Sequence, residues 1–424
     1  MLLLIGLVLG LSLSAPAQWT PTRGAKRQLV ITFTVKDSII FAGVSAGPYP
    51  DTTYIGGALR STDYGATWVK IDSGFFTGTV FPLTVYSLIV VGQSLFAGTS
   101  NGVFISSNDG ATWMQASTGI DSDEGSRNVQ ALVFSGSNLF AGTENGVFYS
   151  SNRGANWSRR DSGLGSSNEN VLSMAYMGST LLAGVNDNGI YISTDTGKSW
   201  SNPSMVGNST MSFAKLDSTL FAGGGGIRAS IDEGNTWTFL KSSPKDTLDN
   251  GYLTIESLAA VGRCLLAGTD FYGIFLSSDR GNSWNAVNDG LNGFLDLTVW
   301  SITTAGQNLI IGTATNIWRR PLSEVITQVQ NDRPATTKQF SLKQNYPNPF
   351  NPLTVIEYDL PSYSFVSLKL FDVLGREIET LVNSYQSPQH YAVRFDASRL
   401  ASGVYLYRIA AGRFVSTKKL LLIK

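Results

Sequence analysis

SSDRGNSW, residues 277–284, is one of six copies of an eight-residue pattern, called the box below. The other copies are STDYGATW (61–68), SSNDGATW (106–113), SSNRGANW (150–157), STDTGKSW (193–200) and SIDEGNTW (230–237). A second marker, two apolar residues and then Ala-Gly, ends at Gly43, Gly98, Gly142, Gly184, Gly223 and Gly268, with a looser copy at Gly312. The markers recur every 39 to 55 residues. Repeats of about 40 to 50 residues are typical of propeller arrays, so the sequence indicates seven units.

Each unit contains four short β-prone runs separated by turn residues, and helical periodicity is absent. The sequence therefore predicts an all-β fold, a seven-bladed β-propeller with four-stranded blades over residues 18–323. The seventh unit, residues 299–325, lacks a box and a closing tryptophan. Trp19 precedes Gly24 much as Trp113 precedes Gly119. We expect the N-terminal strand around Trp19 to complete the last blade, because closure removes unpaired strand edges.

The chemistry of the box favours a structural role. Its glycine is expected at positive φ, where a Cβ is penalised. Two residues earlier comes a side-chain oxygen that can accept backbone N–H groups within the turn, at Asp63, Asn108, Asn152, Asp195, Asp232 and Asp279. Two of these six are Asn, which keeps the acceptor oxygen and loses the charge. A metal site or catalytic acid would not tolerate that change, so no catalytic residue is assigned to the boxes.

Composition excludes several classes of function. Lys plus Arg and Asp plus Glu are equal at 31 each, which leaves no basic surplus for nucleic acid. One cysteine, Cys264, and one histidine, His390, cannot build a Cys or His metal cage. A Ser-His-Asp or Cys-His arrangement is excluded within the repeats, which contain no histidine. We therefore expect no metal site and no cofactor.

The two ends of the chain differ from the repeats. Residues 1–14 are almost wholly apolar and Ala15-Pro16-Ala17 follows, which predicts a cleaved signal peptide over residues 1–17. No other long apolar segment is present, so we expect no transmembrane segment in the mature chain. Residues 324–340 are polar and indicate a linker. Residues 341–424 show short alternating strands, which predict a small Ig-like β-sandwich.

The boxes resemble the Asp-box, or BNR, repeats of sialidase-type β-propellers. They are also similar to the repeats of photosystem II stability factor-like proteins and of some xyloglucan-cleaving enzymes. The resemblance implies that the boxes lie at the periphery, away from a central binding face. Sialidase activity would require three converging arginines and an opening R-I-P motif, and the R-I-P motif is missing here. A role in photosystem assembly conflicts with the export signals.

The C-terminal segment closely resembles the type A C-terminal sorting domain of the type IX secretion system. The matching segments are NYPNPFNP (345–352), DVLG (372–375), SGVY (402–405) and the terminal Lys418, Lys419 and Lys424. QSPQHYAVRF departs from the family, which usually has Gly before the histidine. The resemblance implies Sec export, passage through the type IX machinery, and release or anchoring at the cell surface. His390 is then a residue of the sorting domain.

Any binding face should use the loops that enter first strands and those that join second to third strands. The candidates are Asp51, Tyr54, Asp121, Asp123, Glu124, Arg127, Asp270, Phe271, Tyr272 and Asp296. Aromatic residues beside carboxylates suit contacts with a sugar or a peptide. The sequence thus favours a secreted or cell-surface module that binds a glycan or a protein. The alternative is a glycoside hydrolase with paired carboxylates on the central face.

Overall fold

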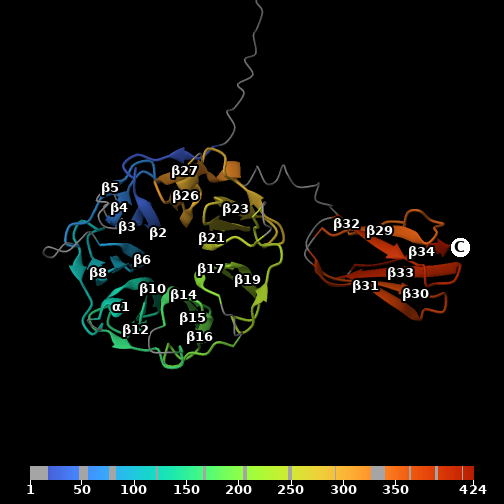
Figure 1. Cartoon of the computed structure of the whole chain (residues 1–424), viewed down its shortest axis with the longest axis horizontal. Coiled ribbons are helices and arrows are strands. Elements are labelled where there is room, and N and C mark those ends of the chain that lie inside the picture. The colour runs from blue at the N-terminus through green and yellow to red at the C-terminus, as the bar shows by residue number, and fades with distance from the viewer. Residues whose placement is uncertain are drawn as a thin grey trace, which may run out of the picture. The chain divides into compact units, whose positions relative to one another are not determined.

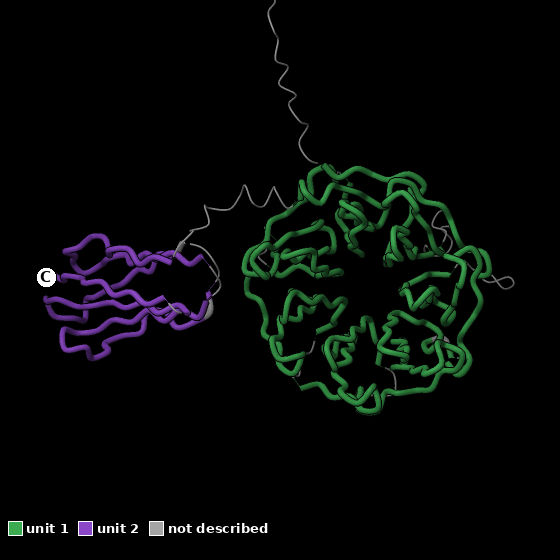
Figure 2. Tube along the Cα trace, turned by 180° about the vertical axis from the view of Figure 1, so that it is seen from behind, with its two compact units in different colours: residues 1–328 green, residues 329–424 purple. Residues whose placement is uncertain are grey.

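The computed structural model describes residues 18–46, 56–75, 83–120, 123–165, 169–203, 208–246, 251–291, 293–325, 340–361, 364–386, 390–412 and 414–424. The expected signal peptide and most of the expected linker lie outside these residues. The chain divides into two compact units, residues 1–328 and 329–424 (Figure 2). Each unit is all-β and is described here by itself.

The described part of the first unit forms seven antiparallel sheets arranged in a ring (Figure 1). The first three are β2 (Leu29–Lys36), β3 (Ile39–Ser45), β4 (Gly57–Ser61) and β5 (Val69–Lys70); β6 (Val85–Val91), β7 (Ser94–Thr99), β8 (Gly102–Ser106) and β9 (Met114–Gln115); and β10 (Val129–Ser135), β11 (Asn138–Thr143), β12 (Gly146–Ser150) and β13 (Ser158–Arg159). The next three are β14 (Val171–Met177), β15 (Thr180–Val185) and β16 (Gly189–Ser193); β17 (Thr210–Leu216), β18 (Thr219–Gly224), β19 (Gly226–Ser230) and β20 (Thr238–Phe239); and β21 (Ile255–Val261), β22 (Cys264–Thr269), β23 (Ile274–Ser277) and β24 (Asn285–Ala286).

The seventh sheet joins the two ends of the unit. Its order is β1 (Thr20–Pro21), β27 (Ile317–Pro321), β26 (Asn308–Thr313) and β25 (Val299–Ala305). Thr20 pairs with Arg319 and Pro21 with Trp318. The indole of Trp19, only 2% exposed, donates to Val287 O at 2.6 Å. The expectation that the N-terminal strand completes the last sheet is confirmed by this pairing.

The core lies between neighbouring sheets, which explains the Ala-Gly marker. Phe41 in β3 packs in one cluster with Val85, Leu95 and Trp113 of the next sheet. A Cβ added at Gly98 in β7 would lie 2.8 Å from the carbonyl oxygen of Val129 in the following sheet. The marker glycine is therefore required because the backbones of adjacent sheets approach each other closely.

The structure corrects two expectations about local elements. The sheet of β14, β15 and β16 has three strands among the described residues, and its expected fourth strand is a single bridge from Ile192 to Ser201. Pro203 follows two residues later and has no N–H to extend that pairing. The sequence shows no helical periodicity, yet two loops contain single helical turns, α1 (Glu124–Arg127) and the 3₁₀ helix η1 (Phe294–Leu297).

Antiparallel order separates the loops onto two faces. The tight turns between first and second strands lie at the same end of the strands as the boxes, which join third to fourth strands. We call this side the box face. The loops from second to third strands, and the connections from each sheet to the next, lie at the opposite end. We call that side the loop face.

The described part of the second unit contains two antiparallel sheets around one core. One consists of β28 (Ser341–Leu342), β29 (Leu353–Asp359) and β32 (His390–Asp396), and the other of β31 (Glu377–Gln386), β30 (Ser364–Phe371), β33 (Gly403–Ala411) and β34 (Phe414–Leu422). The expected motif NYPNPFNP joins the first sheet to the end of the second. Buried Asn345 donates from its backbone N–H to the Tyr407 hydroxyl at 2.8 Å, and Phe350 N–H donates to Leu421 O at 3.0 Å.

Candidate functional site

The box residues are occupied by bonds within their own turns. In the first box, Asp63 Oδ1 accepts from the Ser61 hydroxyl at 2.8 Å and from Thr67 N–H at 2.9 Å. Asp63 Oδ2 accepts from the Thr67 hydroxyl at 2.6 Å. Gly65 has a φ of 82°, and Tyr64 before it is also left-handed at 57°. The predicted positive φ is confirmed at all six box glycines, and the residue before each glycine shares it, which the sequence did not suggest.

The Asn boxes show how the charge can be lost. Asn108 Oδ1 still accepts from Ser106 and from Thr112 N–H, both at 2.9 Å, while Asn108 Nδ2 donates to the Thr112 hydroxyl at 2.9 Å. The threonine hydroxyl simply exchanges its donor role for an acceptor role. In the Asp195 box, hydrogen bonds from the Ser199 hydroxyl and backbone lower the pKa of Asp195 to about 2. Its carboxylate therefore stays ionised and serves as a hydrogen-bond acceptor for its own turn.

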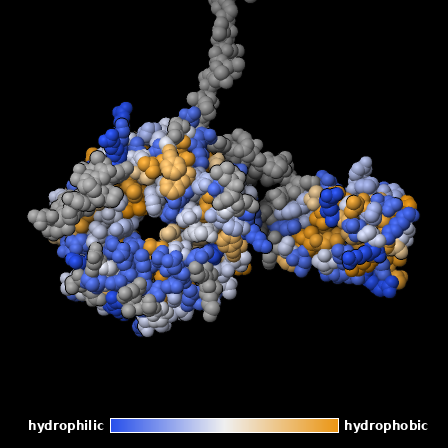
Figure 3. All heavy atoms as spheres, viewed as in Figure 1, coloured by the Kyte–Doolittle hydropathy of each residue, from blue (hydrophilic) through white to orange (hydrophobic). Residues whose placement is uncertain are grey.

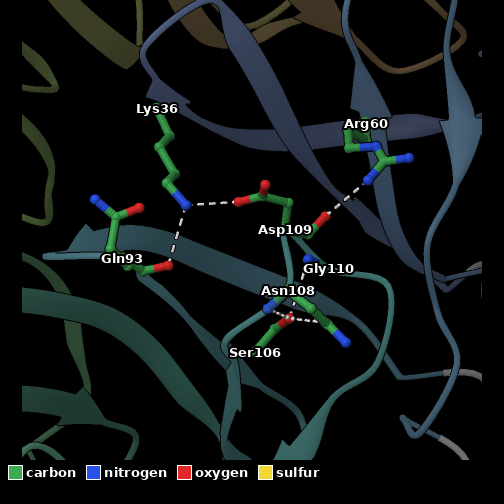
Figure 4. Close-up of polar contacts among 7 residues, drawn as sticks. All are labelled: Lys36, Arg60, Gln93, Ser106, Asn108, Asp109 and Gly110. Carbon is green, nitrogen blue, oxygen red and sulfur yellow. Dashed lines mark hydrogen bonds and ion pairs between the residues drawn. The ribbon is translucent and has the colours of Figure 1, made fainter.

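Boxes also tie neighbouring sheets together. Figure 4 shows Asp109, the left-handed residue of the second box, against the preceding sheet. Lys36 Nζ donates to Asp109 Oδ1 at 2.7 Å and to Gln93 O at 3.1 Å, and Arg60 donates to Asp109 O at 3.3 Å. Arg280 makes a similar contact in another box, with its guanidinium 2.5 Å from Asp217. These contacts join neighbouring sheets on the box face.

The predicted loop-face residues fall into separate groups. Asp51, Tyr54 and Asp121 lie outside the described residues, as does the side chain of Glu124. Asp123 caps α1 by accepting from Ser126 N–H at 2.8 Å and also accepts from Asn145. Arg127 lines a shallow groove with Gln115, Ser117, Thr118 and Ile120. In Figure 1, α1 lies across the ring from β23, so this group is remote from the other candidates.

The remaining candidates, Asp270, Phe271, Tyr272 and Asp296, belong to an exposed hydrophobic surface that extends across two sheets. Phe271 and Tyr272, on the loop from β22 to β23, are 40% and 36% exposed. Phe294 and Leu295, in η1 before β25, are 68% and 45% exposed. The rings of Phe271 and Phe294 are stacked, with centroids 4.7 Å apart and an interplanar angle of 12°. We call these four residues the aromatic platform. η1 packs beside β26, and Figure 3 shows hydrophobic surface where Figure 1 labels β26 and β27.

A hydrogen-bonded frame holds the aromatic platform. The Thr298 hydroxyl accepts from Phe271 N–H at 3.3 Å and donates to Asp270 Oδ1 at 3.4 Å. Gly273 N–H donates to Leu297 O at 2.7 Å, which links the two loops directly. Asp296 accepts from Gly293 N–H at 3.1 Å and from the Thr315 hydroxyl. Phe271 is held at a φ of 64°, an uncommon conformation for an aromatic residue that requires such surroundings.

Two carboxylates, Asp270 and Glu256, lie near the start of β21, because Asp270 N–H donates to Thr254 O at 3.2 Å just before that strand. Every first strand of the ring is bulged near its start, and in β21 the bulge falls between Ile255 and Ser257. Glu256 is the bulged residue. Burial, and then the negative charge of Asp270, raise the pKa of Glu256 to about 7. Burial also raises the pKa of Asp270, against the effect of the Thr298 hydrogen bond. β-Bulges are frequent next to functional sites, where they change the direction in which a side chain points.

The structure thus brings together Asp270, Phe271, Tyr272 and Asp296 of the predicted set. It adds Glu256, Phe294 and Leu295, which sequence reasoning missed. Glu256 could have been noticed as the one charged residue in the mostly apolar strand IESLAAV. Phe294 and Leu295 stand next to Asp296 in the sequence, but their exposure follows from the turn of η1 and is not visible in the letters.

Solved structures with similar folds include several β-propellers. The extracellular domain of the putative one-component system BT4673 from B. thetaiotaomicron has a TM-score of 0.55 and 18% identity, over 80% of this chain and 45% of that one. PorZ, a surface component of the type IX secretion system of Porphyromonas gingivalis, has a TM-score of 0.52 and 14% identity, over 93% and 59%. An ancestral GH74 enzyme has a TM-score of 0.52 and 14% identity, over 96% and 64%. These likenesses show a propeller-like fold.

The chain spans about half of the solved extracellular domain of BT4673 and less than two thirds of the solved PorZ chain. A search of curated protein sequences found no match. Among the described residues, no helix has the length and apolar character needed to span a bilayer. Residues 344–424 match the family model of the secretion system C-terminal sorting domain. The chain therefore carries a type IX sorting signal and is exported to the cell surface or the medium.

Proposed function

We propose that this protein is a secreted or cell-surface binding module that holds a glycan or protein ligand on its loop face. The observation that carries the proposal is the aromatic platform, because four large apolar side chains are exposed on a frame that fixes their positions. Exposed aromatic residues on a rigid scaffold supply contact area with little loss of conformational entropy on binding. The box face, by contrast, uses its polar groups to hold the ring.

The proposal includes the finer architecture. The seven sheets are interpreted as blades of an Asp-box β-propeller over residues 18–323, with the boxes at its periphery. Residues 1–17 form the signal peptide, residues 324–340 the linker, and residues 341–424 an Ig-like sorting domain. The propeller is then the cargo and the sorting domain its export signal. The six box geometries and the pairing of β1 with β27 support this interpretation.

A glycoside hydrolase is the second candidate function. The GH74 structural neighbour and the raised pKa of Glu256, about 7, favour it. A carboxyl group with such a pKa can act as a general acid near neutral pH. It would need a second carboxylate across a bound sugar, and Asp270 or Asp296 would have to take that role.

A binding and hydrolysis panel tests both functions on the chain from Gln18 to Lys424. Labelled plant and microbial polysaccharides, sialosides and surface proteins are offered, and retained ligand and released sugar are measured. We expect retention without release, and loss of retention in Phe294→Ala. Ile231→Ala, which removes an 81% exposed side chain from a box, is the matched control and should bind normally. Release of sugar would establish a hydrolase. If the Phe294→Ala variant retains the ligand as well as the unchanged protein does, the proposed binding on the loop face is contradicted.

A further inference from the structure

We propose that the aromatic platform, together with Asp270 and Glu256, binds a cationic side chain, a lysine or arginine presented by a partner protein. This inference rests on the proposed function and gives its ligand a chemical class. It concerns the loop between β22 and β23, the bulge of β21 and η1, which the structure brings to one place on the loop face.

The charge at this place is unbalanced. Among the described residues, neither Glu256 nor Asp270 forms an ion pair. The nearby Asp246 accepts from the Tyr272 hydroxyl at 2.6 Å, and Asp296 accepts from Gly293 and Thr315. Lys245 lies over the Tyr252 ring, 4.7 Å from its centroid.

A cationic ligand relieves a cost that the free protein carries. Burial raises the pKa of both carboxyl groups, and the negative charge of Asp270 raises the pKa of Glu256 further. An ammonium or guanidinium group in contact with them would restore their ionised forms. A neutral sugar could stack on the same rings, but it would leave this repulsion in place.

The aromatic platform completes the recognition. The stacked Phe271 and Phe294 leave much of Phe294 open to solvent. An aromatic face attracts a cation, and Arg can also stack flat against it. The methylene stem of a Lys or Arg side chain would lie along Leu295 while its charged end reaches the carboxylates. The combination of rings and acids therefore fits a long basic side chain better than a short or neutral one.

The experiment uses the chain from Gln18 to Lys424 and four probes: acetylated Arg-Gly repeat and Lys-Gly repeat peptides, a Glu-Gly repeat peptide of equal length, and a mixture of neutral oligosaccharides. Dissociation constants are measured at pH 8 and pH 5.5, at low and at high salt. We expect the basic peptides to bind and the acidic peptide not to bind. Affinity should fall about ten-fold at pH 5.5, where Glu256 is protonated, and should fall at high salt.

Three variants assign the effect to the site. Asp270→Asn and Phe294→Ala should each weaken peptide binding at least ten-fold, whereas Glu256→Gln should weaken it at pH 8 and remove most of the pH dependence. Asp37→Asn removes one carboxylate from the turn between β2 and β3 on the box face, and should change nothing. Thermal melting verifies that each variant is folded.

The outcomes separate the two proposals. Binding of neutral oligosaccharides that is lost in Phe294→Ala, with no binding of basic peptides, would overturn the cationic ligand and leave the proposed function standing. Equal binding of the basic peptides by Asp270→Asn and by the unchanged protein would also overturn it. If no probe binds to the folded protein and the wider panel is negative as well, the proposed function fails, and this inference fails with it.

Discussion

Trp19 and Arg320 donate hydrogen bonds to the same backbone oxygen, that of Val287. The distances are 2.6 Å from Trp19 Nε1 and 3.4 Å from Arg320. Arg320 pairs with Leu309 in the register where Ser106 pairs with Leu95, so it takes the position of a buried box serine. It is itself fully buried. In the one sheet without a box, an arginine and the N-terminal tryptophan thus converge where the ring is closed.

Closure by Trp19 predicts a large loss of stability on truncation. Trp19→Ala should lower the free energy of unfolding by about 3–5 kcal/mol, because it empties a buried site in the seam between two sheets. Trp19→Phe, which retains most of the ring but loses the N–H, should cost about 1–2 kcal/mol. Deleting residues 18–24 should lower the melting temperature further than Trp19→Ala does. Chemical denaturation measures these values, and unchanged melting of the deletion variant would contradict closure by this strand.

The glycines that follow the fourth strands predict a second stability effect. Gly119 has a φ of 93°, and a Cβ there would lie under 3.0 Å from Trp157 O in the next sheet. Gly136 has a φ of 64° and open space around it. Gly136→Ala should cost about 1–2 kcal/mol for its left-handed backbone alone. Gly119→Ala should cost clearly more, because the two sheets must also separate. Urea denaturation measures the free energy of unfolding of both variants. Equal losses would argue against a close contact between the two sheets at Gly119.

Acid denaturation should depend on the charge of a box. The pKa of Asp195 is lowered from 3.8 to about 2 in the folded protein. The folded state therefore binds fewer protons than the unfolded state in this range, so Asp195 stabilises the fold above about pH 4 and loses this contribution as the pH falls toward 2. Asp195→Asn should show a shallower decline of melting temperature between pH 4 and 2. Asn108→Asp, the reverse exchange, should make this decline steeper. The same dependence of melting temperature on pH in both variants and the unchanged protein would contradict the prediction.

Glu256 should have the opposite pH dependence. Its pKa rises from 4.5 to about 7 on folding, so between these values the folded state holds a proton that the unfolded state has released. Stability contributed at this site is therefore lost as the pH rises through this window, by about 3 kcal/mol at most. Glu256→Gln should melt higher than the unchanged protein at pH 8, and should gain little at pH 4. Calorimetry at the two pH values measures the difference, and a gain at pH 4 equal to that at pH 8 would contradict it.

The repeated units could be predicted because the same physical requirement recurs in each. The box needs a left-handed glycine, an acceptor oxygen and a tryptophan, and the Ala-Gly marker needs close contact between sheets, so both leave fixed letters at a fixed period. The N-terminal closure followed from the same tryptophan position. The weaker fourth strand at Ser201 was missed because Pro203 acts on one copy only.

The candidate site could be predicted only in part. Asp270, Phe271, Tyr272 and Asp296 were found because topology assigns their loops to the loop face. Glu256 was missed because its role depends on a bulge, which is a property of strand register rather than composition. Phe294 depends on a contact between two sheets that are consecutive in the ring, and no local pattern reports the stacking of Phe271 on Phe294.

Hydrogen–deuterium exchange of the chain from Gln18 to Lys424, with and without a saturating Arg-Gly repeat peptide, would locate the ligand site. We expect slower exchange in residues 270–273 and 293–298, with the six boxes unchanged. Protection confined to the box face, or spread evenly over the ring, would contradict a ligand site on the aromatic platform.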